Sequence, residues 1–229
     1  MAVYKIADLT AEYSCRFDLL KSRSKKYICD EKEAQIKLSL GEDYYISRRN
    51  KFPTLTDEEI EYIGMGAAFY KELLNFDGMM LHASAVELNG EAYLFSAPSG
   101  TGKSTHTEGW LRVFENAEII NDDKPAIRKV NGQYFAFGTP FSGKNDISIN
   151  KGYPIKGICF LDRGKNRIEK LNTQSAMSPL FNQTIRPDDE SKMDLLCSRA
   201  EDVLESINFY AMFCDTSDEA VKMAYDKMK

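Results

Sequence analysis

The chain has 229 residues, 43% of them hydrophobic and 28% charged, which is ordinary for a globular protein with a sizeable core. Its formal net charge of −5 argues against a nucleic-acid partner, and no apolar run approaches the ~20 residues of a membrane span. Five scattered cysteines, without a C-x-x-C spacing, argue against a disulfide framework and a zinc site. Residues 1–8 do not resemble a signal peptide, and we expect a cytoplasmic protein of one domain, residues 1–229.

Residues 1–50 carry β-prone runs between polar turns. Short strands are predicted at 4–6, 27–29, 34–40 and 44–46. The basic run at 21–26 is typical of a solvated hairpin tip, with a patch for a partner as the alternative. Together with the helix that follows, these elements are expected to form an N-terminal extension of the domain, residues 1–75.

A helix is predicted to begin after Thr56, because Glu59 stands three residues further on and completes a capping box. Apolar side chains then recur at helical spacing as far as Asn75. They are Ile60, Ile63, Ala67, Tyr70 and Leu74. Gly64 and Gly66 each lower helix propensity by about 1 kcal/mol relative to Ala, or they permit a neighbouring element to pack closely.

Hairpins dominate the middle of the chain, where extended runs flank turn sequences at 89–90, 131–132 and 164–166. The predicted pairs are 81–88 with 91–96, 126–130 with 134–137, and 155–161 with 167–171. A short strand at 119–120 ends at an acidic pair. The C-terminal part, residues 173–229, is predicted to be helical at about 174–183, at about 188–205 and after 215, with a strand at 209–213.

A glycine-rich loop, Ala-Pro-Ser-Gly-Thr-Gly-Lys-Ser-Thr at 97–105, separates the β-prone run 91–96 from a helical run. Strand, loop and helix in this order are the context of a phosphate-binding loop, whose backbone N–H groups attract anions. Lys103 would reach the β- and γ-phosphates, and the Ser104 hydroxyl would bind Mg²⁺. The predicted nucleotide-binding residues are Ser99, Gly100, Thr101, Gly102, Lys103, Ser104 and Thr105. Ala97 replaces the first glycine of the usual pattern, and the alternative is a turn without a ligand.

Only one such strand–loop–helix unit stands among the hairpins, so a regular alternation of strands and helices is not expected. The predicted fold class is α/β with α+β character. We expect a mixed, hairpin-rich sheet around the single P-loop unit, within a P-loop core at residues 76–172, and then the helical C-terminal part.

An acidic pair, Asp122-Asp123, follows the strand at 119–120. One carboxylate would hold Mg²⁺, and the other would accept the proton of an attacking hydroxyl. Adjacent strand residues point to opposite faces, so both can serve one site only where the strand ends and the backbone turns. Asp122 is assigned to the metal and Asp123 to the base, with the reverse split left open. The alternative is an ordinary acidic turn.

His82 lies across the 89–90 turn from position 97, since each is seven residues from the turn residue on its own side. It is therefore expected beside the phosphates, where it would bind the γ-phosphate or polarise the acceptor, unless it is a core histidine. Lys144, in a loop rich in Gly and Pro, would neutralise charge on the transferred phosphate, or the loop is an ordinary turn. Arg186 would serve the nucleotide or cap a helix. His106 is left between a helix-surface and a nucleotide-binding role.

The chain carries His82, the loop at 97–105, the acidic pair and the segment 138–144 in this order, and it resembles the HPr kinase/phosphorylase-type P-loop kinases. These kinases share a phosphate-binding core with phosphoenolpyruvate carboxykinases. The resemblance covers about residues 79–162. It implies that Lys103 and Ser104 hold phosphates and metal, that the acidic pair supplies metal ligation and the base, and that His82 is the active-site histidine. The N-terminal domain and the protein-binding C-terminal loop of true HPr kinases are not recognised, so HPr is not the expected substrate.

We therefore expect an ATP- and Mg²⁺-dependent kinase with Asp123, His82 and Lys103 as catalytic residues. It would transfer the γ-phosphate to a hydroxyl of a small molecule or peptide, for example a serine-like acceptor. One alternative is a nucleotide-binding regulatory or scaffold protein, and another is a carboxykinase-like lyase, which two histidines make hard to assemble. The sequence leaves open the acceptor, the nucleotide base and the reverse phosphorolysis. The resemblance makes a homo-oligomer plausible.

Overall fold

A mixed sheet forms the centre of the protein. The computed structural model describes residues 2–98 and 100–229. Within that part, nine strands form the sheet, in the order β4-β8-β9-β10-β6-β5-β7, with β12 pairing both β10 and β11. The strands are β4 (Gly78–Met80), β5 (Ala83–Leu88), β6 (Glu91–Ser96), β7 (Glu118–Asp123), β8 (Ala126–Val130), β9 (Gln133–Phe137), β10 (Gly152–Arg163), β11 (Arg167–Leu171) and β12 (Phe209–Cys214). Strand β10 runs parallel to β6 and β12 and antiparallel to β9, so the predicted mixed α/β class is confirmed.

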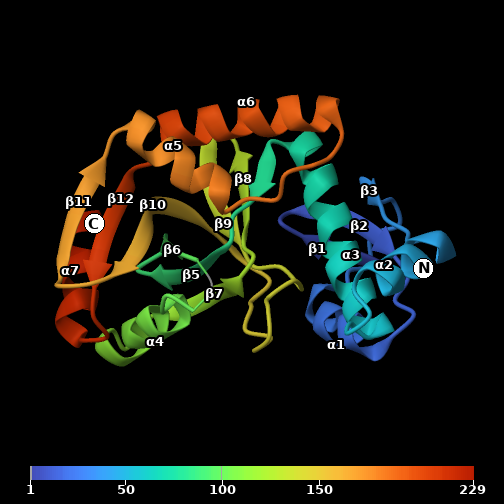
Figure 1. The fold of residues 1–229 in the computed structure, drawn as a ribbon, viewed down its shortest axis with the longest axis horizontal. Helices are drawn as coiled ribbons and strands as arrows, with labels where there is room; N and C mark the ends of the chain where they lie inside the picture. The colour runs from blue at the N-terminus through green and yellow to red at the C-terminus, as the bar shows by residue number, and fades with distance from the viewer. Residues whose placement is uncertain (1, 99) are drawn as a thin grey trace.

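Helices surround this sheet, and a small second sheet lies near the N-terminus (Figure 1). The helices are α1 (Asp18–Ser24), α2 (Glu42–Lys51), α3 (Asp57–Leu73), α4 (Lys103–Val113), α5 (Thr173–Asn182), α6 (Glu190–Ser206) and α7 (Asp218–Met228), with short 3-10 turns η1 (Lys25–Tyr27) and η2 (Leu74–Phe76). The small sheet contains β1 (Ala2–Ile6), β2 (Leu9–Tyr13) and β3 (Ile36–Lys37). Helix α6 crosses over β8, α7 lies beside β11 and β12, and α1–α3 stand at the opposite end (Figure 1). No helix in the described ranges is long and apolar enough to cross a membrane.

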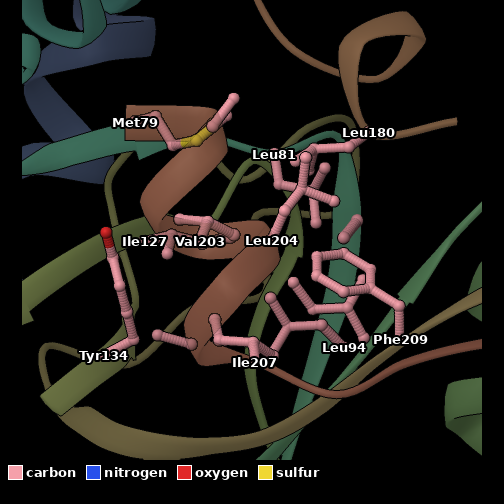
Figure 2. Packing of buried hydrophobic residues seen from close by; sticks show 14 of the residues in the cluster. Met79, Leu81, Leu94, Ile127, Tyr134, Leu180, Val203, Leu204, Ile207 and Phe209 are labelled. Carbon is pink, nitrogen blue, oxygen red and sulfur yellow. The ribbon is translucent and has the colours of Figure 1, made fainter. Parts of the chain in front are cut away.

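The sheet is held against α6 by a buried hydrophobic cluster (Figure 2). From α6 and its C-terminal end, Val203, Leu204 and Ile207 project onto sheet residues that include Leu94 and Phe209. Burying one such side chain contributes about 1.5–3 kcal/mol. A second cluster joins the N-terminal residues to the same sheet, because side chains of β1, β2 and α3 pack against residues of β8 and β9. The division into a single domain stays a prediction.

The turn chemistry explains two of the three hairpins. At Asn89-Gly90 and Asn131-Gly132 both residues have positive φ, which is the geometry that favours Asn-Gly between paired strands. The third predicted hairpin is wrong. Strand β11 pairs antiparallel with β12, which lies parallel to β10 and has no exposed residue, whereas β11 has no fully buried one. A local turn at 164–166 does not reveal that a strand 45 residues later takes the inner position.

The helix predicted from the capping box is confirmed: Thr56 accepts from the Glu59 backbone N–H, and the Glu59 carboxylate accepts in return. The C-terminal helices and the strand near 209–213 are also confirmed. Gly64 permits the expected close packing, because a Cβ there would lie 2.6 Å from the Tyr44 ring.

The predictions for residues 1–50 are mostly wrong. The run 44–46 lies inside α2, which has acidic residues in its first turn and basic residues in its last turn, as the helix dipole favours. The run 27–29 is the end of η1 followed by a single bridge residue, and only Ile36–Lys37 of 34–40 is a strand. The basic run 21–26 belongs to α1 and η1 rather than to a hairpin tip, and it buries Arg23.

Candidate active site

The loop that follows β6 leads directly into α4, so strand, loop and helix stand in the predicted order. Gly100 and Gly102 have φ of 80° and 116°, and nothing lies within 4 Å of a Cβ at either position. These glycines therefore meet a conformational requirement and leave open space beside the backbone. Ala97 is buried in the cluster around Phe95 and Trp110, so its methyl group takes part in packing. Ser99 lies outside the described residues.

Pairing of β5 with β6 places His82 beside the start of this loop. Ala83 is paired with Ser96, so His82 is next to position 97 in the same register, as the count from the turn predicts. The Ser96 hydroxyl donates to the His82 carbonyl oxygen at 2.8 Å. The imidazole then reaches two partners, with Nδ1 2.9 Å from Gln183 Oε1 and Nε2 3.1 Å from Asp123 Oδ1.

Strand β7 brings Asp122 to the first turn of α4. Its register sets Asp122 opposite Ser84, whose hydroxyl donates to Asp122 Oδ1 at 2.5 Å. The Ser104 hydroxyl lies 3.2 and 3.3 Å from the two carboxylate oxygens, and Asn145 Nδ2 lies 3.5 Å from Oδ2. The Ser104 hydroxyl and the Asp122 carboxylate, from α4 and β7, thus meet at the N-terminus of α4, the positive end of the helix dipole.

Asp123 turns toward the same cavity because β7 ends there. Its φ of 139° is one that L-residues rarely adopt, and this bend lets two adjacent carboxylates face one space. Asp123 contacts His82 and the ammonium group of Lys124. Burial raises the pKa of Asp123, but the hydrogen bonds from His82 and Lys124 outweigh this and bring the pKa to about 2. Asp123 therefore stays ionised at neutral pH.

Lys103 opens α4 and bends back over the loop, where its ammonium group donates to the Ala97 carbonyl oxygen at 2.7 Å. Burial lowers the pKa of Lys103, and the negative charges of Asp123 and Asp122 act in the opposite direction. Lys103 is therefore a half-buried ammonium group at the start of α4, close to the two carboxylates.

These side chains line one cavity of about 710 Å³, which we call the phosphate cavity. Its first wall is the loop, the start of α4 and the end of β7. Its second wall comes from α1, α3 and the loop after β9, and Lys144 is one of its lining residues. The second-wall residues are Leu19, Arg23, Glu59, Tyr62, Ile63, Gly143, Lys144 and Asn145.

The loop of the second wall, around Gly143, is held by contacts with residues that are far from it in the sequence. Gly143 has a φ of 75°, and a Cβ there would lie 2.8 Å from Asp123 Cβ, so only glycine fits this approach. The Gly143 N–H donates to the Tyr62 hydroxyl at 3.0 Å. The Arg23 guanidinium donates to the carbonyl oxygens of Gly143 and Lys144 and stacks 4.5 Å from the centre of the Tyr62 ring.

Sequence reasoning missed Arg23, Tyr62 and Gln183. Arg23 sits in a basic run that looks solvated, and Tyr62 lies off the apolar stripe used to predict α3. Gln183 follows α5, about a hundred residues from the histidine it contacts through both its side chain and its backbone carbonyl. No local pattern in the sequence identifies any of the three.

Two residues considered at the sequence level lie elsewhere. Arg186 does not line the phosphate cavity but a separate one, beside Tyr44 and Arg48. His106 points into the core, where its Nε2 accepts from Trp110 Nε1 at 3.3 Å, and burial lowers its pKa to about 4. It is a neutral packing residue.

The donor set suits a magnesium ion that is bound together with a nucleotide. Among the described residues, no three His, Cys, Asp or Glu side chains form a group that could hold a metal by themselves. Mg²⁺ typically takes one or two protein oxygens, several waters and substrate phosphates. The Ser104 hydroxyl and the Asp122 carboxylate provide such a pair.

Comparison with known proteins gives one family. Residues 52–186 match a family described as "SynChlorMet cassette protein ScmC", and this segment includes the glycine-rich loop, the acidic pair and Arg186. No curated protein matches the chain. One similar solved structure is that of the Hpr(Ser) kinase/phosphatase from Coxiella burnetii, with 9% identity and a TM-score of 0.38, covering 65% of this chain and 95% of that chain.

Proposed function

The chain belongs to the family of SynChlorMet cassette protein ScmC, and we propose that it is an ATP- and Mg²⁺-dependent kinase that phosphorylates a hydroxyl group. One observation carries the proposal: Ser104 and Asp122 meet at the first turn of α4, in the same cavity as the His82–Asp123 pair. Metal-binding oxygens and an oriented carboxylate side by side are what in-line phosphoryl transfer requires.

Phosphate binding falls to the loop and α4. Open backbone at Gly100 and Gly102, the N-terminus of α4 and the Lys103 ammonium group would surround the phosphates of ATP. Ser104 and Asp122 would hold Mg²⁺, which neutralises charge on the β- and γ-phosphates when it is bound. The cationic Lys144, on the second wall, would meet the transferred phosphoryl group.

Asp123 would act as the base. The acceptor oxygen forms a bond to the γ-phosphorus, the bond from that phosphorus to the bridging oxygen of ADP breaks, and the hydroxyl proton passes to Asp123. Asp123 is ionised at neutral pH, so it can accept a hydrogen bond from the hydroxyl and orient it, and it would take the proton as the new bond forms. His82, held by Gln183, would fix the position of this carboxylate.

The test is transfer of label from γ-labelled ATP in the presence of Mg²⁺ to free hydroxy amino acids, small hydroxy acids and serine peptides. The wild type should label one acceptor class. Lys103→Ala should lose both ATP binding and transfer, whereas Asp123→Asn should bind ATP but transfer about 10²- to 10⁴-fold more slowly.

Two results would contradict the proposal. Full turnover by Asp123→Asn would remove the assigned base. ATP binding that depends on Lys103, without transfer to any acceptor, would favour a nucleotide-binding regulatory protein instead.

A further inference from the structure

Two further cavities lie beside the phosphate cavity along α3. A second cavity of about 310 Å³ shares Ile63 with it, and a third of about 430 Å³ shares Tyr44, Arg48 and Ala67 with the second. Because each neighbouring pair has lining residues in common, the three cavities lie next to one another along α3. We call the second and third cavities together the α3 groove.

Helix α2 contributes one side of this groove through Tyr44. The Tyr44 ring lies directly on Gly64 of α3, at a distance where any side chain at that position would collide with it. Tyr44 therefore forms a wall that the two cavities share. Apolar side chains remain uncovered beside it, since Ile63 is 51% exposed and Phe52 is 40% exposed.

The two parts of the α3 groove differ in chemistry. Apart from Tyr44 and Arg48, the second cavity is apolar, with a lining of Phe52, Leu55, Ile60, Ile63 and Ala67. Three cations, Arg48, Lys71 and Arg186, line the third cavity against one acid, Asp188. Within the described residues, none of the three cations has a carboxylate within 4.0 Å, although the chain as a whole carries a net charge of −5. Arg48 stacks 5.0 Å from the centre of the Tyr44 ring, but local positive charge without a carboxylate within ion-pair distance still favours an anionic occupant.

We propose that the α3 groove docks an extended, acidic polypeptide segment, and that this segment presents its hydroxyl to the phosphate cavity. The transfer step rests on the kinase function proposed above, but the docking does not. A hydroxyl residue of the segment would lie in the phosphate cavity, an apolar residue in the second cavity and an acidic residue in the third cavity. Mixed apolar and cationic linings suit a peptide better than a nucleic acid, whose regular phosphates would cross the apolar second cavity.

The length of the groove sets the size of the segment. Twelve residues of α3 separate Glu59, at the phosphate cavity, from Lys71, at the third cavity. At about 1.5 Å per residue this is about 18 Å, which an extended chain covers in about five or six residues. A free amino acid would fill only one end.

Binding of fluorescein-labelled octapeptides, measured by anisotropy without nucleotide, tests the docking directly. Each peptide carries one serine, with leucine and then glutamate or lysine scanned through the following and the preceding positions. The best glutamate peptide should bind about tenfold more tightly than its lysine counterpart. The double variant Arg48→Glu with Arg186→Glu should reverse this preference, and Lys222→Glu, on the distant helix α7, should leave it unchanged.

A second variant tests shape rather than charge. Ala67 lines both cavities of the groove, so Ala67→Trp should close it and weaken binding of the best peptide about tenfold or more. The thermal unfolding midpoint and circular dichroism report whether this variant is folded. A folded Ala67→Trp protein with wild-type peptide affinity would overturn the proposal.

Other outcomes separate the docking from the kinase function. If the wild type prefers glutamate peptides, the double variant prefers lysine peptides and no phosphate is transferred, the result supports docking in the α3 groove and contradicts the kinase function. Phosphate transfer to free serine, with equal binding of all peptides, would support the kinase function and contradict docking in the α3 groove. Equal binding of glutamate and lysine peptides, or equally tight binding of a labelled single-stranded oligonucleotide, would also overturn the docking of an acidic peptide.

Discussion

The two walls of the phosphate cavity are built in different ways. The first wall comes from the loop after β6, the start of α4 and the end of β7, which adjoin one another through strand pairing. The second wall depends on side chains of the N-terminal residues, such as Arg23, that grip a loop more than a hundred residues away. Backbone geometry therefore defines the first wall, and individual side-chain contacts define the second.

This difference separates two parts of the proposed reaction. Strand register fixes Asp122 and Asp123, so a change there disturbs the sheet as well as the chemistry. The second wall rests on a few hydrogen bonds of about 1–3 kcal/mol each, including Lys26 Nζ to the Ser148 carbonyl oxygen at 2.8 Å. The acceptor side can therefore change by substitution while the phosphate side is retained.

The largest effect is expected where the two walls touch, at Gly143. In Gly143→Ala the new Cβ meets Asp123 Cβ at 2.8 Å and stands at a φ of 75°. We expect a loss of about 2–4 kcal/mol of unfolding free energy, and about 100-fold slower transfer because Asp123 is displaced.

Gly90→Ala is the matched control, since Gly90 has a φ of 83° and open space around its Cβ position. It should lose only about 1 kcal/mol and keep its activity. Urea unfolding and transfer assays check both variants, and equal losses would show that the walls do not meet through Gly143.

Acid should destabilise the first wall through His106, which lies on the buried face of α4, against Phe95 and Trp110. Its pKa is about 4 in the folded protein against 6.5 when unfolded, so only the unfolded chain takes up a proton between these values. This contribution is complete above pH 6.5 and falls by about 3 kcal/mol as the pH drops to 4. His106→Gln, which keeps an acceptor for Trp110, should lose this dependence in urea titrations at pH 7, 5.5 and 4. If the unfolding free energy of His106→Gln falls with pH as steeply as that of the wild type, His106 is not the group responsible.

The substitution Arg23→Met should weaken the second wall. Two carbonyl oxygens lose a charged donor, so we expect about 2 kcal/mol lower stability and a higher KM for the acceptor, with ATP affinity retained. Lys21→Met, exposed on the same helix, is the control and should change neither value. A matching rise in KM in the control would show that general charge, rather than the grip on the loop, is responsible.

The smallest effect is expected at Tyr27, whose hydroxyl donates to Ser148 Oγ at 3.0 Å. Tyr27→Phe should cost about 1 kcal/mol. In a double-mutant cycle with Ser148→Ala, the second substitution should add less than it does alone, because the two side chains share one bond. Strict additivity in urea unfolding would exclude this contact.

Local chemistry made much of the first wall predictable. The capping box at Thr56, the Asn-Gly turns and the glycine-rich loop each act over a few residues, and counting from the 89–90 turn was enough to bring His82 to the loop. The acidic pair was recognised from its place after a strand, and the structure adds the bend at Asp123 that turns both carboxylates to one space.

What only the tertiary structure decided are the contacts between distant residues. The burial of Arg23, the contact of Gln183 with His82 and the place of Arg186 depend on which elements become neighbours. The sequence alone determined the positions of the Asn-Gly turns, of the capping box at Thr56 and of the glycines with positive φ in the loop. These preferences belong to single residues and their nearest neighbours. Sheet order and long-range packing decided the rest, because β12 lies between β10 and β11 although it follows both of them in the sequence.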